Sequence, residues 1–360
     1  MRIGLTLSRH VGMNLAKSIL LIFLVFILLV TIIDFTQLAR WVGTSGLSLT
    51  TAIVVSALRG PGLAEGVLPF AVLFAAMATF VQLNRRLELT VTRSAGVSAW
   101  QILLPATLVA LVVGVVAVTL YNPGAVALRE LSVSIGGFGG GATGLGNGGP
   151  VWLRQNGDDG PSIIGASRTA DEGRVLAGVT AFVFAEDGGF RRRIDAPEAR
   201  LVGNYWVFSE PIINEVGAPA VARSEYRLHT NLSLAQITES LGDPATVAFW
   251  RLPGLIEIAS ASALPATDLK MRLSGLLSLP LMLVAMVLIA AVVSLRFSRT
   301  LNIGRLIVTG AASGFVLYLL MVVSGDLGRG GIVPPEIAAW APVLLATLVS
   351  VTLLLREEDG

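Results

Sequence analysis

The chain has 360 residues, of which 54% are hydrophobic and only 14% charged, and its formal net charge at pH 7 is +2. A soluble domain carries about 25% charged residues, so this composition excludes an ordinary soluble protein and indicates a membrane protein. The chain has no cysteine and only two histidines, which excludes disulfides and cysteine-based chemistry and predicts neither a metal nor a cofactor.

Motifs for enzymatic work are also missing from the sequence. It contains no G-x-x-x-x-G-K-[ST] motif, so we expect no nucleotide site of its own, and any ATP energy has to come from a partner. No Ser/Lys dyad, aspartate pair or zinc motif stands at a spacing useful to an intramembrane protease. The sequence has no basic patch with interleaved aromatic residues, which is the pattern that would predict nucleic-acid binding. The sequence therefore predicts a protein that is not an enzyme.

Three apolar runs open the chain. We expect a first membrane span at about 14–39, a short outer connection with an amphipathic pattern at 43–61, a second span at about 62–81 and a third at about 99–121. Asn122-Pro123 is expected to end the third span, because proline disfavours the α conformation in its predecessor and cannot donate a hydrogen bond.

The composition changes at about residue 124 and stays polar to about residue 268. Residues 136–149 are glycine-rich and predict a flexible linker. After the linker, short alternating runs broken by turn residues predict an all-β domain of the sandwich or jelly-roll kind. The expected strands are 151–153, 162–164, 175–184, 193–202, 205–208 and 220–228. Helical patterns follow at 234–237 and 249–258.

Three further spans are expected at about 270–295, 303–323 and 336–355. Under this topology ten basic residues lie in inner segments. Only three, Arg40, Arg59 and Arg329, lie in the short outer loops. The inner ten are Arg2, Arg9, Lys17, Arg85, Arg86, Arg93, Arg296, Arg299, Arg305 and Arg356. This bias places both termini in the cytosol. The fold class is therefore six transmembrane helices with a periplasmic, jelly-roll-like β domain inserted between helices 3 and 4.

The domain prediction has three parts. Residues 1–123 hold helices 1 to 3 with a cytosolic surface helix at about 84–97, residues 124–268 form the periplasmic β domain, and residues 269–360 hold helices 4 to 6.

The surface helix is an arginine-rich segment caught between two spans. Leu83, Leu87 and Val91 recur at helical spacing and can face the bundle, which leaves Glu88 on the opposite face. A carboxylate there can pair with a basic residue of a cytosolic partner, or it can simply balance Arg85 or Arg86 on a solvated face. Gly96 stands where a helix C-cap is expected, and Ser98 can cap the next helix.

A second group of candidates lies near the expected outer ends of the spans. Arg40, Arg59 and Arg129 either snorkel to the interface or contact an anionic lipid headgroup. Asp34 and Glu65 are acidic residues in the same regions, and intramembrane acids are often functional.

Several stretches together resemble the lipopolysaccharide-export permeases of the LptF/LptG (YjgP/YjgQ) family. In chain order they are Asp34-Phe35, Leu68-Pro69-Phe70, Arg86-Leu-Glu-Leu through Arg93-Ser-Ala-Gly-Val-Ser, Val151-Trp-Leu-Arg, Ser278-Leu-Pro-Leu to Ser294-Leu-Arg, Pro334-Pro and Ala338-Ala-Trp-Ala-Pro. The resemblance covers nearly the whole chain in one order. The Trp152 context and the Ala-Ala-Trp-Ala-Pro stretch are more similar to LptG than to LptF.

The resemblance implies an ABC-transporter permease of the Gram-negative inner membrane. Its partners would be a dimer of the cytosolic ATPase LptB, the paired permease LptF, and LptC and LptA of a periplasmic bridge; its substrate would be lipopolysaccharide, taken from among the membrane lipids. The surface helix would be the coupling helix, which makes Arg86, Glu88, Arg93, Ala95 and Gly96 ATPase-coupling candidates.

The family also implies a lipid cavity with a lateral gate built from spans one and five. Its candidates in this chain are Phe35, Arg40, Phe70, Arg129 and Phe315.

An alternative from another class is a membrane sensor or mechanotransmission protein, whose outer β domain senses and whose inner loop reports. Both hypotheses predict a cytosolic partner at Glu88. They differ in whether the helical bundle holds a lipid.

Overall fold

The computed structural model describes residues 5–45, 48–86, 88, 98–136, 151–157, 160–170, 174–185, 189–215, 219–230, 247–261, 266–296 and 303–359. The expected glycine-rich linker and the expected helix at 234–237 lie outside these residues, except for Gly136. The chain divides into two compact units, Met1–Leu128 with Ala248–Gly360 and Arg129–Val247.

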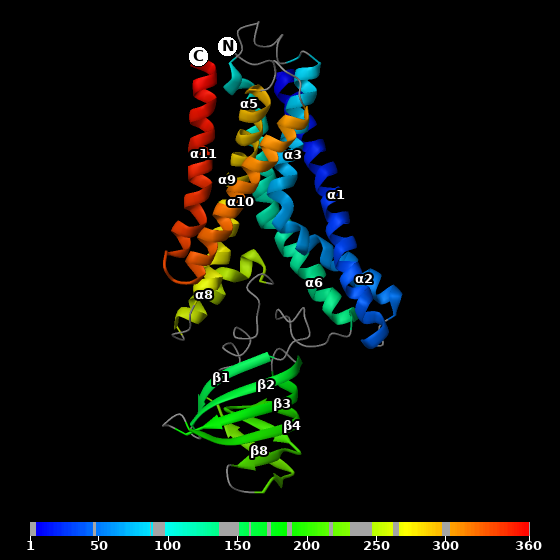
Figure 1. Ribbon diagram of the computed structural model, residues 1–360, viewed down its shortest axis with the longest axis vertical. Helices are drawn as coiled ribbons and strands as arrows, with labels where there is room; N and C mark the ends of the chain where they lie inside the picture. The colour runs from blue at the N-terminus through cyan, green and yellow to red at the C-terminus, as the bar shows by residue number, and fades with distance from the viewer. Residues whose placement is uncertain are drawn as a thin grey trace. The chain divides into compact units, whose positions relative to one another are not determined.

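The first unit is a bundle of long helices (Figure 1). Its elements are α1 (Leu5–Ser45), α2 (Leu49–Ala64), the 3-10 helix η1 (Glu65–Val67), α3 (Leu68–Arg85), α5 (Ala99–Val116), the π-helix η2 (Ala117–Tyr121), the start of α6 (Asn122–Gly136), the 3-10 helix η5 (Phe249–Arg251), α8 (Leu252–Ala261), α9 (Thr267–Arg296), α10 (Ile303–Arg329) and α11 (Pro335–Asp359). We call the end that carries both termini the terminal end, and the end that carries α2 and α8 the far end.

Within the described residues, six helical stretches are long and apolar enough to cross a membrane. They are Ser8–Arg40, Leu49–Arg85, Trp100–Ser132, Thr267–Ser294, Gly304–Arg329 and Pro335–Arg356. These stretches confirm the six predicted spans, and every one except the last begins or ends several residues beyond the bounds expected from the sequence.

The expected outer connection at 43–61 contains the helix α2 over residues 49–64, and its location outside the membrane stays a prediction. Ser48 starts this helix, since its side-chain oxygen accepts a hydrogen bond from the Thr51 backbone N–H at 3.1 Å. The chain bends after α2 through the short 3-10 turn, and Pro69 stands in the first turn of α3, where a missing N–H is tolerated.

The predicted helix end at Asn122-Pro123 is wrong, because α6 continues directly from the π-helix η2. The wider π turn changes the hydrogen-bond register just before Pro123, at the point where the ladder loses a donor. Pro123 therefore stands near the start of a new helical segment, and the helix continues without a break.

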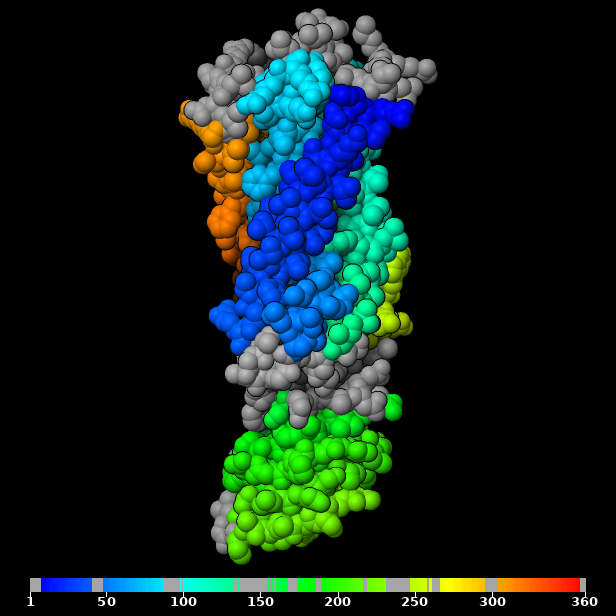
Figure 2. All heavy atoms as spheres, turned by 90° about the vertical axis from the view of Figure 1, so that its right-hand side faces the viewer, coloured from blue at the N-terminus to red at the C-terminus, as the bar shows by residue number. Residues whose placement is uncertain are grey.

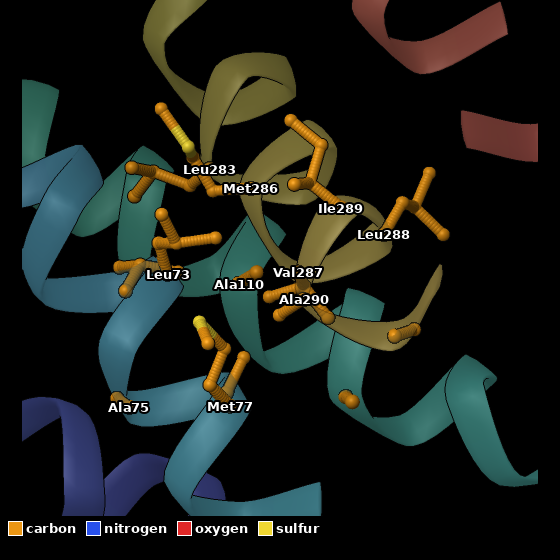
Figure 3. Close-up of a cluster of buried hydrophobic side chains, with 14 of the residues drawn as sticks. Leu73, Ala75, Met77, Ala110, Leu283, Met286, Val287, Leu288, Ile289 and Ala290 are labelled. Carbon is orange, nitrogen blue, oxygen red and sulfur yellow. The ribbon is translucent and has the colours of Figure 1, made fainter. Parts of the chain in front are cut away.

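The core of the first unit is centred on α9, which packs against α3, α5, α10 and α11. Leu283, Met286, Val287 and Ala290 on α9 are fully buried and meet Leu73 and Met77 of α3 (Figure 3). By contrast, Figure 2 shows α1 running over the surface of this unit, and both α1 and α10 expose many large apolar side chains. This is the pattern of helices that face lipid or a second membrane subunit.

The second unit is built on one antiparallel β-sheet. Its strands are β1 (Val151–Gly157), β2 (Gly160–Ala170), β3 (Val175–Phe184), β4 (Phe190–Val202), β5 (Tyr205–Ser209), β6 (Ile212–Glu215), β7 (Val221–Ala222) and β8 (Glu225–His229). Neighbours follow the order β1-β2-β3-β4-β5-β8, and β6 pairs with both β4 and β7. The antiparallel β region is therefore as predicted, and the jelly-roll topology stays a prediction.

One buried glutamine joins the two ends of this sheet. Gln155 of β1 accepts hydrogen bonds from the Trp206 indole N–H at 3.2 Å and the Thr230 hydroxyl at 2.6 Å, and it donates to the His229 carbonyl at 3.3 Å. Since β1 and β8 stand at opposite ends of the strand order, the sheet is rolled until its ends meet here. The roll encloses an apolar core that includes Ile164, Trp206 and Phe208.

Candidate functional site

The candidate site has two parts, one at each end of the helical unit. The first part begins where α3 ends. Arg86 closes that helix by donating its N–H to the Gln82 carbonyl at 3.1 Å. The Glu88 carboxylate then lies 3.4 Å from His10 Nε2 on α1 and 4.0 Å from Arg86 Nη1. Glu88 thus connects the start of α1 to the end of α3.

This arrangement gives Glu88 partners within its own chain. Its side chain is 31% exposed and that of His10 44% exposed, so water screens the contact and it is weak. Ser98 caps α5 as expected, since its hydroxyl oxygen accepts from the Gln101 N–H at 3.3 Å. Arg93, Ala95 and Gly96 lie outside the described residues.

The second part lies at the far end and contains an ion pair that sequence reasoning missed. Arg59 Nη2 of α2 stands 3.7 Å from Asp34 Oδ1 of α1, with side chains 20% and 9% exposed. The helices approach closely beside the pair, because a Cβ on Gly60 would lie 2.0 Å from the Thr31 hydroxyl. Asp34 Oδ2 is buried and has no hydrogen-bond partner among the described residues.

Two of the predicted lipid-gate residues come together. Phe70 of α3 packs against Tyr318 of α10 with ring centroids 5.5 Å apart, and Phe315 stacks on the same tyrosine at 6.4 Å. A Cβ on Gly314 would lie 2.4 Å from Leu73, so α10 approaches α3 closely at this point. Because Gly314 has no side chain, α10 comes close enough to α3 for the rings to meet. We call Phe70, Phe315 and Tyr318 the aromatic seam.

The other predicted gate residues lie elsewhere. Phe35 is half-buried and Arg40 exposed, both on α1, which packs on α2, α3 and α5. Arg129 is half-buried on α6, at the start of the second unit.

A further ion pair at the far end joins Glu65 of η1 to Arg272 of α9, whose Nη2 lies 2.8 Å from Glu65 Oε1. The sequence analysis singled out Glu65 but not its partner Arg272. The signal that could have found both pairs is the cost of a lone charge in an apolar span, which requires a partner of opposite sign. Among the described residues, no group of three or more histidine, aspartate or glutamate side chains could hold a metal ion.

Comparison with known proteins identifies the family. The family model of the lipopolysaccharide export system permease LptF/LptG matches residues 9–356. The lipopolysaccharide export system permease protein LptG of Escherichia coli strain K12 is 22% identical over 364 residues, covering 98% of this chain and 98% of that protein. LptG of the O6:H1 strain CFT073 shows the same identity and coverage. Because the family model spans nearly the whole chain, from α1 through the β-sheet to α11, this protein belongs to the LptF/LptG family of lipopolysaccharide export permeases.

Proposed function

We propose that this chain is the permease half of an ABC transporter that extracts lipopolysaccharide from the inner membrane. ATP is hydrolysed by a dimer of a cytosolic LptB-type ATPase, a second permease of the LptF kind completes the membrane part, and the lipid passes to a periplasmic bridge of LptC and LptA. The match of the family model over residues 9–356 carries this proposal. The excess of basic residues on the terminal side supports a cytosolic terminal end and a periplasmic location for residues 124–268.

The geometry at the terminal end supports a docking point for the ATPase. Glu88 stands between the last turn of α3 and the first turns of α1, and it contacts His10 of α1. A basic group of the ATPase that takes the place of His10 would pull on α3 and release α1 in the same step. One carboxylate would thereby link nucleotide-driven movement to two spans.

The exposed apolar surface supports a lipid substrate and a second membrane subunit. α1 exposes Leu20, Leu24 and Leu28 along one side, each more than half exposed. α10 exposes Phe315, which is part of the aromatic seam with Phe70. Acyl chains match such surfaces, whereas the anionic headgroup of lipopolysaccharide matches the exposed Arg40 guanidinium at the periplasmic end.

The test is co-purification of the complex from native membranes with Glu88→Ala, His10→Ala and Glu336→Ala. Truncating one partner of a charge pair that docking buries costs about 2–5 kcal/mol, so we expect Glu88→Ala to lower the recovered ATPase at least tenfold. Glu336 is an exposed carboxylate at the far end, and Glu336→Ala is the matched control that should retain the ATPase.

His10→Ala separates the docking role from a purely internal one. It breaks the same contact within the chain but leaves the carboxylate available, so the ATPase should remain bound. Equal losses in Glu88→Ala and His10→Ala would show that the contact only supports the fold and would refute the docking role. A wild-type protein recovered with no ATPase, no second permease and no lipopolysaccharide would overturn the transport proposal in favour of the sensor hypothesis.

A further inference from the structure

Three polar side chains lie together at the far end of the helical unit. Arg272 Nη2 lies 2.8 Å from Glu65 Oε1, and Asn122 Nδ2 donates to Glu65 Oε2 at 2.9 Å. Asn122 is completely buried, although it stands in a stretch that is apolar enough to cross a membrane. We call Glu65, Asn122 and Arg272 the polar clasp.

The clasp also holds the chain where it returns from the second unit. The side-chain oxygen of Asn122 accepts a hydrogen bond from the Phe249 backbone N–H at 2.9 Å. Asn122 begins the helix through which the chain leaves the first unit, and Ala248 is the residue at which the chain re-enters it. One side chain therefore ties the outgoing and the returning connection together and binds both to Glu65.

A second contact docks the returning segment on the same irregular turn. The Trp250 indole N–H donates to the Thr119 carbonyl at 3.1 Å. In a regular helix that carbonyl would accept from residue 123, but Pro123 has no N–H to offer. The π-helix and the proline thus present a backbone acceptor that the returning chain occupies.

Stability alone does not explain this arrangement. Well-packed apolar residues would serve a bundle equally well or better than a buried ion pair, and ionisable groups inside membrane spans mark functional positions. The clasp also has a distinctive position, because Glu65 comes just before α3 and Glu88 just after it. α3 has 18 residues, which form a rod of about 27 Å between the two carboxylates.

We propose that the polar clasp transmits displacement of α3 to the chain segment that returns from the β unit. This inference rests on the proposed function, in which nucleotide-driven movement enters at Glu88. In this role the clasp residues are positioning residues that act through the Phe249 segment.

The first measurement is hydrogen exchange at the Phe249 amide in the complete complex with its ATPase. In the wild type we expect exchange to change several-fold between the nucleotide-free and the ATP-and-vanadate-trapped complex. Asn122→Leu keeps the volume but removes the acceptor, so the amide should exchange rapidly in both states. Thr119→Val is the matched control, because the Thr119 hydroxyl donates locally to the Val115 carbonyl at 2.8 Å and the Thr119 carbonyl is retained.

The second measurement is lipopolysaccharide delivered to LptA per ATP hydrolysed. We expect Asn122→Leu to assemble and hydrolyse ATP but to deliver at least fivefold less lipid per ATP, while Thr119→Val matches the wild type.

The outcomes separate this inference from the function on which it rests. A wild-type complex that hydrolyses ATP without delivering lipid refutes the proposed function itself. Delivery at the wild-type ratio by Asn122→Leu refutes the clasp. If that variant does not assemble, the wild-type exchange data decide: a Phe249 amide that does not respond to nucleotide shows that the clasp is only a brace, and a several-fold response supports transmission.

Discussion

Gly114→Ala tests whether the contact between α5 and α9 is set by backbone approach. A Cβ on Gly114 would lie 2.4 Å from Pro280 Cα, which is about 1 Å short of the 3.4 Å at which ordinary van der Waals contact begins. The clash is with backbone, so no side-chain rotation relieves it and the helices have to separate. Overpacking of this kind costs about 1–3 kcal/mol, whereas replacing a helical glycine by alanine gains about 1 kcal/mol.

The clash should outweigh the gain because separation of α5 from α9 also loosens neighbours such as Ala110 and Leu283. We expect Gly114→Ala to lower the free energy of unfolding of the helical unit by about 1 kcal/mol, the middle of the overpacking range less the gain in helix propensity. The assay is equilibrium unfolding of the full chain in detergent–lipid micelles. The matched control is Gly275→Ala on α9, where a Cβ would meet nothing within 4 Å; it should be neutral or stabilising. Equal effects of the two substitutions would refute the reasoning from close approach.

Two further substitutions test the polar contacts in each unit. Arg59→Met strands the buried Asp34 carboxylate and should cost about 3–5 kcal/mol in the same unfolding assay, and adding Asp34→Asn should restore most of the loss; a double variant as unstable as the single one would argue against the pair. Gln155→Leu leaves the Trp206 and Thr230 donors without this acceptor and should destabilise the β unit by about 1–3 kcal/mol, seen as faster hydrogen exchange at the ends of β1 and β8 in the full chain. Unchanged exchange there would show that Gln155 does not hold the ends of the sheet together.

The elements that the sequence predicted well are those with a strong local pattern. The strand expected at 175–184 has the same bounds in the structure, and the spans expected at 270–295 and 303–323 are contained in α9 and α10. An apolar run of more than 18 residues or a period-2 alternation can be recognised within the segment itself, because the pattern repeats along it. Such elements need no information from distant parts of the chain.

The errors arise where a contact with a distant part of the chain compensates for an unfavourable local feature. Proline at position 123 predicted a helix end, but the π turn accommodates it and Trp250 satisfies the Thr119 carbonyl from a distant part of the chain. Likewise, the partner of Glu65 lies 207 residues further along the chain at Arg272. No window of sequence contains both members of such a pair, so only the fold reveals it.

The polar contacts at the two ends of the bundle differ in strength, and this difference affects how the helices move. Apolar contacts between α3 and α9 are non-directional and allow small shifts, so the polar contacts at the helix ends fix the register. The His10–Glu88 contact at the terminal end has side chains 44% and 31% exposed, and water screens it. The Glu65–Arg272 pair has side chains 24% and 13% exposed and is reinforced by Asn122. Under the proposed function the weaker contact gives way to the ATPase while the stronger one persists, so a displacement of α3 that begins at Glu88 should reach the clasp and be passed on.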